Sequence, residues 1–141
     1  MRVALLQYSI AWADKETNLR IAEEHIAALA GKADVAVLPE MFATGFCTNH
    51  PELAETMDGE IIRRLQAVAD KSGVAIVSSF ICLPDPRCPI PDTRTKLRNR
   101  GFMIKPHAEI EIQDKRHLYA HGGEDLFFQP AQKRHIFEYK G

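Results

Sequence analysis

The stretch Val35-Ala36-Val37-Leu38-Pro39-Glu40-Met41-Phe42-Ala43-Thr44-Gly45-Phe46 joins a short apolar run to a turn of small residues, with one carboxylate at the junction. A short apolar run such as 34–38 is typical of a parallel strand that is buried on both faces. In open α/β sheets, the ligand crevice lies just beyond the carboxyl ends of such strands. Glu40 is therefore a candidate functional carboxylate, although a surface glutamate at a strand end is the simpler interpretation of its position alone.

Working outward from this run, the first 83 residues follow the order strand, helix, strand, helix, strand. Residues 2–9 are predicted as a buried strand, and residues 14–30 as an amphipathic helix. A second helix is predicted at 59–72, and another buried strand at 74–83. This order predicts an α/β fold with right-handed crossover connections.

The pattern changes after residue 83, where four prolines between 84 and 92 predict a loop. Strands are expected at 99–105 and 110–114, paired as an antiparallel hairpin, and a last strand is expected at 134–139. No internal repeat or linker interrupts the chain, and 141 residues are about one domain's length.

The charge and hydropathy of the chain argue against several classes of partner. The net charge is −1, from 18 basic and 19 acidic side chains without a basic block, so no nucleic-acid partner is expected. No apolar run reaches the roughly 18 residues that cross a membrane, so no membrane partner is expected. The apolar N-terminal run is also too brief for a signal peptide.

The cysteines indicate a reducing compartment. With no export signal in the sequence, Cys47, Cys82 and Cys88 are expected as reduced thiols in a cytoplasmic protein, a bridge between Cys82 and Cys88 being the weaker alternative. No cysteine–histidine spacing fits zinc, and no glycine-rich phosphate-binding motif is present. We therefore expect neither a metal nor a cofactor.

Three more places along the chain carry chemistry. Lys115 follows a predicted strand, where a lysine can stabilise an oxyanion, although a charged turn is the alternative. His117 is a candidate base, but a lone histidine in a turn is more often a hydrogen-bonding spacer. Glu124 follows two glycines, and a structural turn and a functional carboxylate fit it about equally. Phe42 and Phe46 are expected to exclude water from Glu40 and to raise its pKa, as a general base requires.

Taken together, four segments occur in an order and spacing that resemble the carbon–nitrogen hydrolase (nitrilase) superfamily, most closely its omega-amidase branch. The segments are Leu38-Pro39-Glu40-Met41-Phe42-Ala43-Thr44-Gly45-Phe46, Asn99-Arg100, Asp114-Lys115-Arg116-His117-Leu118-Tyr119 and Gly122-Gly123-Glu124. The resemblance runs over essentially all of residues 1–141 but corresponds to only the first half of a family member.

The resemblance implies an α-β-β-α sandwich of the nitrilase type, of which this chain is about the first half. It also implies hydrolysis of a small amide, such as the 2-oxo acid monoamide 2-oxoglutaramate, to an acid and ammonia by a Glu–Lys–Cys mechanism. In that scheme Glu40 is the general base, Lys115 stabilises the oxyanion, and Glu124 is the second glutamate of the site. The residues expected to bind substrate or support the site are Phe42, Phe46, Asn99, Arg100 and His117.

The nucleophile of that scheme is not found in this chain. The family places it in a Cys-Tyr-Asp type of segment beyond the strand that ends here at Tyr139, whereas Cys47 follows the Glu40 motif directly and Cys82 and Cys88 precede Lys115. The isolated chain is therefore expected to be inactive, and to self-associate or to bind a complementary C-terminal half. The alternatives are a non-catalytic remnant that binds a partner and a structural α/β module.

Overall fold

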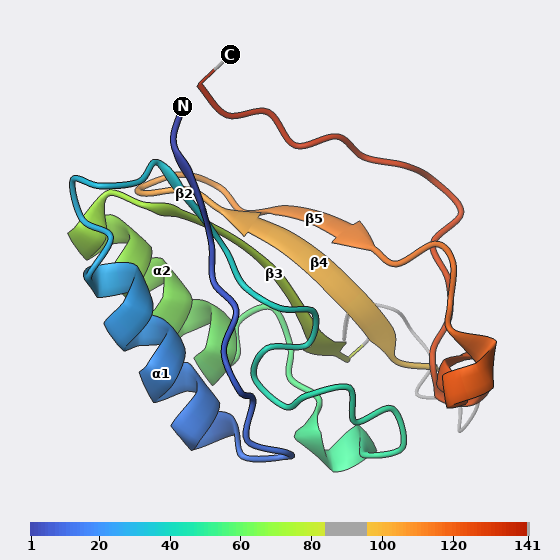
Figure 1. The fold of residues 1–141 in the computed structure, drawn as a ribbon. Helices are drawn as coiled ribbons and strands as arrows, with labels where there is room; N and C mark the ends of the chain where they lie inside the picture. Colours follow the sequence, from blue (N-terminus) through green and yellow to red (C-terminus); the bar gives the residue numbers. More distant parts are fainter. Residues whose placement is uncertain (84–95, 141) are drawn as a thin grey trace.

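The computed structural model describes residues 1–83 and 96–140, which form one five-stranded sheet with helices on one side (Figure 1). The strands lie in chain order across the sheet: β1 (Val3–Leu5), β2 (Val35–Val37), β3 (Ala75–Cys82), β4 (Arg98–Ile104) and β5 (Glu111–Asp114). Strands β1, β2 and β3 are parallel, whereas β4 and β5 are antiparallel to their neighbours. The predicted α/β class and the antiparallel hairpin of β4 and β5 are confirmed.

Two long helices, α1 (Lys15–Ala27) and α2 (Glu60–Ser72), lie side by side against one face of the sheet (Figure 1). Helix α1 begins where the Asp14 carboxylate accepts a hydrogen bond from the Thr17 amide, at 3.0 Å. Helix α2 ends at Gly73, whose φ of 70° is the left-handed conformation that favours glycine. Three shorter helices lie outside the sheet: η1 (Pro51–Leu53) between β2 and α2, and η2 (Ala120–Gly122) and α3 (Glu124–Phe127) after β5.

The main core lies between the two long helices and the sheet. Its largest side chains with almost no exposed surface are Leu19, Ile26, Phe42, Ile61, Leu65, Ile76, Phe80, Phe102 and Ile104. The predicted helical faces therefore have the right period, although the first helix ends at Ala27, three residues earlier than expected. None of the helices that the structure describes is long and apolar enough to cross a membrane.

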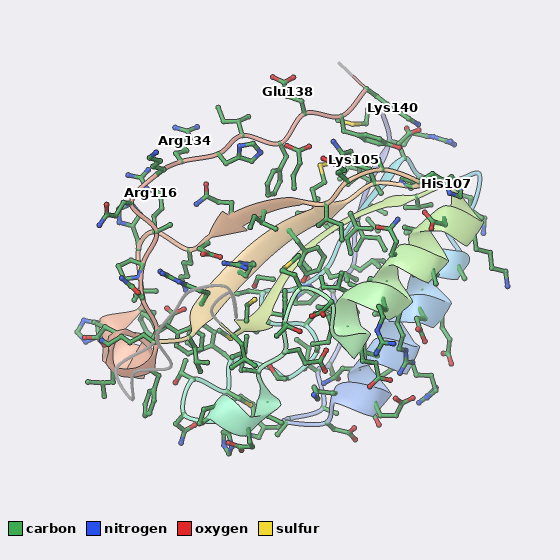
Figure 2. The ribbon with its side chains drawn as sticks, turned by 180° about the vertical axis from the view of Figure 1, so that it is seen from behind. Lys105, His107, Arg116, Arg134, Glu138 and Lys140 are labelled. Atoms are coloured by element: carbon green, nitrogen blue, oxygen red, sulfur yellow. The ribbon has the colours of Figure 1, made fainter. Side chains whose placement is uncertain are left out.

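Among the described residues, no helix layer covers the opposite face of the sheet, and only the extended C-terminal segment 132–140 runs over it (Figure 1). Phe137 and Tyr139 of this segment pack against Val35, Ala75 and Met103 of the sheet. Figure 2 shows Arg134 and Glu138 of the same segment pointing away from the sheet. The described residues thus form a helix layer and a sheet layer, half of the expected α-β-β-α sandwich.

One strand prediction is wrong and another is confirmed only in part, for the same physical reason. The segment expected as a strand at 134–139 is extended, but no backbone hydrogen bond joins it to a strand in the described part of the chain. The strand expected at 2–9 covers only Val3–Leu5, and the side chains of Val3 and Leu5 are 51% and 77% exposed instead of buried. Both segments lack a neighbouring strand or a second layer on one side, which an apolar pattern does not reveal. The predicted loop at 84–92 lies outside the described residues.

Candidate active site

Four polar side chains from four separate segments meet at one end of the sheet. The Nζ atom of Lys115 lies 2.8 Å from Oε1 of Glu40 and 2.9 Å from Oε2 of Glu124. The Nδ2 atom of Asn99 donates to the same two carboxylates, at 2.7 Å from Oε1 of Glu40 and 2.9 Å from Oε1 of Glu124. The structure thus brings Glu40, Lys115 and Glu124 together, and Asn99 joins them in one hydrogen-bonded group.

Glu40 lies directly beyond the end of β2, where the ladder with β3 stops. The last backbone bond runs from the Leu38 amide to the Val77 carbonyl, at 2.9 Å. Pro39 follows and has no N–H, so the ladder cannot continue and the chain turns away from the sheet. The Glu40 side chain is 48% exposed, and its carboxylate is therefore within reach of a ligand or a second polypeptide.

Lys115 is held in place by the hairpin of β4 and β5. Its amide donates to the carbonyl of Asn99 at 2.9 Å, which continues the ladder by one residue beyond β5. In the next pair of residues on β4 and β5, the guanidinium of Arg100 donates two hydrogen bonds to the Asp114 carboxylate, at 2.7 Å and 3.0 Å. The Lys115 ammonium also lies over the ring of Phe46, 5.0 Å from its centroid. These contacts restrict the positions that the Lys115 side chain can adopt.

Glu124 is buried completely, with no exposed surface. It starts α3 directly after Gly123, whose φ of 71° is in the left-handed region. Its Oε1 atom accepts from Asn99, and its Oε2 atom accepts from Lys115 and from the Tyr119 amide, the last at 2.7 Å. A charge can be buried when it is paired and hydrogen-bonded in this way. Glu124 is therefore the internal anchor of the group.

The charges around Lys115 determine its protonation state. Partial burial acts to lower its pKa, but the hydrogen bonds and the charges of Glu40 and Glu124 outweigh that effect and hold the pKa above its ordinary value of 10.5. The side chain therefore stays an ammonium at neutral pH. A fixed cation at this place is suited to stabilising negative charge that develops on a bound carbonyl oxygen.

The remaining predicted site residues differ in how they are placed around this group. Phe46 lies beneath the Lys115 ammonium. Arg100 belongs to the opposite face of the sheet from Asn99, because successive strand residues alternate. Phe42 lies in the main core, with no exposed surface, and His117 is exposed. The expectation that two phenylalanines exclude water from Glu40 is not met, since Phe42 packs elsewhere and the carboxylate is half exposed.

Asn18 is a supporting residue that the sequence reading did not select. Its side chain is buried in α1 and makes three backbone hydrogen bonds, two with Ala11 and one with the carbonyl of Ala43. It thereby fastens the turn that follows Glu40 to the first helix. A detectable signal exists, because Asn18 is a polar residue that precedes Ala22 and Ile26 at intervals of four on the buried face.

Neither described cysteine is placed as a nucleophile. Cys47 and Cys82 are free and buried, and their thiols donate to the carbonyls of Thr44 and Leu83, at 3.0 Å and 3.2 Å. Burial raises the pKa of Cys47 and raises that of Cys82 to about 11. Cys88 lies outside the described residues. Within residues 1–83 and 96–140, no group of three or more potential ligands could hold a metal ion.

Comparison with known proteins gives one consistent family. The family model described as "Carbon-nitrogen hydrolase" matches residues 2–139. The omega-amidase YafV of Escherichia coli (strain K12) is 28% identical over 141 residues, which cover all of this chain and 51% of that protein. The 2-oxoglutaramate amidase of Bacillus subtilis (strain 168) is 30% identical over 132 residues, 90% of this chain and 50% of that protein.

A solved structure agrees with these relatives. XC1258 from Xanthomonas campestris, a CN-hydrolase superfamily protein with an arsenic adduct in its active site, superposes with a TM-score of 0.86 at 31% identity. The match covers 99% of this chain and 49% of the other. The chain thus spans about half the length of the curated relatives it matches.

Proposed function

The chain belongs to the carbon–nitrogen hydrolase family, and we propose that it carries the base and the cation of an active site that hydrolyses a small carboxylic acid amide. The substrate class is a 2-oxo acid monoamide, which is cleaved to the acid and ammonia. The omega-amidase of Escherichia coli and the 2-oxoglutaramate amidase of Bacillus subtilis support this substrate class. Because the chain covers about half of each relative, the proposed activity requires a part that corresponds to their second half.

The observation that carries the proposal is the position of the Lys115 ammonium between two carboxylates of unequal exposure. Glu40 is half exposed and is the general base that takes a proton from the nucleophile. Lys115 donates to the oxyanion that forms when the amide carbonyl is attacked. Glu124 is buried and holds the lysine at the correct place. Asn99 bridges the two carboxylates and fixes their separation.

The reaction in this proposal runs through a thioester. A cysteine thiol attacks the amide carbon and its proton passes to Glu40, which returns a proton to the leaving nitrogen so that ammonia departs. Water, activated by the same carboxylate, then releases the acid and regenerates the thiol. The thiols of Cys47 and Cys82 are buried and donate to the backbone carbonyls of Thr44 and Leu83, so neither serves as the nucleophile of the proposal. The proposal assigns that role to a cysteine in a part that corresponds to the second half of the relatives.

We infer that the partner supplying this cysteine docks on the helix-free face of the sheet. That face holds an open groove of about 830 Å³ between the sheet and the C-terminal segment. Its apolar lining residues include Val3, Val35, Val37, Val77 and Met103. The occupant is a polypeptide corresponding to the second half of the relatives, because the chain covers only 51% of the Escherichia coli protein. A second copy of this chain is the competing occupant.

A cytoplasmic location is part of the same proposal. Its support is the free state of Cys47 and Cys82, which matches a reducing compartment.

Ammonia release from 2-oxoglutaramate tests the proposed activity. The chain is assayed alone and after co-expression with the second half of the Escherichia coli relative. We expect no release by the chain alone, and release by the complemented pair that falls by about 10²- to 10⁴-fold in Glu40→Gln. Lys115→Met is expected to fall similarly, whereas Glu24→Gln on the exposed face of α1 serves as the matched control.

Two outcomes would contradict the proposal. The first is turnover by the chain alone that survives replacement of Cys47, Cys82 and Cys88 by alanine. The second is turnover by the complemented pair that does not respond to Glu40→Gln. A folded pair that binds the amide without releasing ammonia would instead favour the non-catalytic binding module.

A further inference from the structure

We propose that Ser78 and Ser79 are positioning residues that hold the backbone on both sides of Glu40 and so aim its carboxylate. The inference rests on the proposed function, because the orientation of the Glu40 carboxylate matters for catalysis only if Glu40 acts as the base. It concerns neighbouring strand residues that make no contact with the reacting atoms themselves.

The two serines take over where the β2–β3 ladder stops. Pro39 cannot donate a backbone hydrogen bond, so the strand pairing ends just before Glu40. The hydroxyl of Ser78 donates to the Pro39 carbonyl at 2.7 Å. The hydroxyl of Ser79 accepts from the Met41 amide at 3.0 Å. The residue before Glu40 and the residue after it are therefore both tied to β3 by side chains instead of by the backbone.

The geometry of a strand makes this pair an effective clamp. Consecutive strand residues point to opposite faces of the sheet. Ser78 and Ser79 therefore bind the segment that follows β2 from the two faces of the sheet. Both serines are 9% exposed, so little water competes for these bonds. Two ties on opposite sides restrict rotation of the Glu40 peptide units in a way that one tie cannot.

The backbone conformation of Met41 shows that surrounding contacts hold this turn in an unfavourable conformation. Met41 has a φ of 50°, in the left-handed region that side chains other than glycine rarely adopt. Such a conformation persists where the surroundings determine it, and strained residues of this kind cluster at functional sites. Here the Ser79 bond, the Thr44 and Gly45 amides on the Met41 carbonyl, and the complete burial of Met41 provide that constraint.

The backbone at Glu40 has to be fixed by other contacts, because packing does not hold the Glu40 side chain in place. Half of its surface is exposed, and its hydrogen bonds come from Asn99 and Lys115 alone among the described residues. A catalytic group must be oriented closely to be effective, and an exposed side chain loses that orientation unless its base is fixed. The serines supply the fixed base.

The test uses the 141-residue chain itself and requires no turnover. The variants are Ser78→Ala, Ser79→Ala and the double variant, with Ser79→Thr as the conservative rescue. Ser72→Ala is the matched control, because the Ser72 hydroxyl also bonds the backbone but lies at the end of α2. Nuclear magnetic resonance follows hydrogen exchange of the Met41 amide and the pH titration of the Lys115 side chain.

In Ser79→Ala we expect the Met41 amide to exchange about tenfold faster or more, because it loses its acceptor. In the double variant the Lys115 titration should move to lower pH, since a Glu40 carboxylate that drifts no longer supports the ammonium. Ser79→Thr keeps the hydroxyl and should show both readouts of the parent chain, and Ser72→Ala should leave both unchanged.

The inference is overturned if exchange at Met41 and titration of Lys115 in the folded double variant equal those of the parent chain. Should the double variant not fold, Ser78→Ala and Ser79→Ala are read singly against Ser72→Ala by the same two signals. A failure of the proposed activity is seen separately, as absent ammonia release from the complemented pair, and does not alter these signals.

Discussion

The Nζ atom of Lys115 lies 2.9 Å from Oε2 of Glu124, whose side chain has no exposed surface, and 2.8 Å from the half-exposed carboxylate of Glu40. One ammonium therefore joins an internal carboxylate to an accessible one. The internal partner fixes the lysine, while the accessible partner keeps about half of its side-chain surface open to solvent.

Replacing Glu124 by glutamine should destabilise the chain by about 3 kcal/mol, because the Lys115 ammonium and the Tyr119 amide lose a buried anionic acceptor. Urea unfolding followed by circular dichroism measures the change. Glu24→Gln is the control, since Glu24 pairs with Arg20 on the surface with 65% of its side chain exposed, and it should change stability by less than about 1 kcal/mol. Equal effects of the two variants would contradict the anchoring role of Glu124.

The contribution of Lys115 to stability should disappear at high pH. Its pKa is raised above 10.5 in the folded chain, so the folded state holds this proton more tightly than the unfolded state. The contribution is complete below about pH 10 and is lost as the pH rises through the raised value. The stability difference between the parent and Lys115→Met should therefore be constant from pH 7 to about pH 9 and shrink above about pH 10.5.

Lys71→Met on the exposed side of α2 is the control for this pH series, and its stability difference should stay near zero throughout. A Lys115→Met difference that grows with pH would show that the lysine is not stabilised by its two carboxylates.

The thiols of Cys47 and Cys82 should resist alkylation in the folded chain at pH 7. Both are buried, and burial raises the pKa of Cys82 to about 11. Mass spectrometry after iodoacetamide treatment should find both unmodified in buffer and both modified in urea. The rate at Cys82 should rise as the pH approaches 11. Fast labelling of either residue at pH 7 in the folded state would identify an activated thiol and reopen the assignment of the nucleophile.

The isolated chain should self-associate at micromolar concentration through the helix-free face of the sheet. Leu5 on β1 is 77% exposed, and burying a leucine contributes about 1.5–3 kcal/mol. Leu5→Glu should therefore weaken association about tenfold or more in sedimentation velocity. Leu126→Glu changes a leucine that is 69% exposed on α3 and should have little effect. A parent chain that sediments as a stable monomer of 15.9 kDa and binds no hydrophobic dye would count against this surface.

Much of the fold follows from local sequence patterns. The helix at Glu60–Ser72 begins within one residue of the predicted range, because its apolar residues recur with the helical period and Gly73 ends it. The hairpin of β4 and β5 was predicted because two alternating runs flank a short turn. Errors arose at residues 2–9 and 134–139, where the pattern is that of a strand but one side lacks a neighbour.

The candidate site was predicted in part for the same reason. Glu40 and Lys115 each follow a strand, and strand ends that share one edge of a sheet bring their next residues together. The roles of Ser78, Ser79 and Asn18 were not predicted, because a hydroxyl or amide within an apolar run indicates nothing until its backbone partner is known. Phe42 was assigned to the site but lies in the core, since sequence does not show to which side of a turn a side chain points.

The amino-acid sequence by itself determined the order of the two long helices and of strands β1 to β5, the α/β class and the residue types available for chemistry, because hydrophobic period and turn composition act over a few neighbouring residues. Only the tertiary structure decided that Glu124 loses all contact with water while Glu40 keeps half of its surface. It also decided that the helices of the described residues leave one face of the sheet uncovered. At the candidate site, burial and charge pairing join segments up to 84 positions apart, from Glu40 to Glu124, and a local pattern carries no information about that distance.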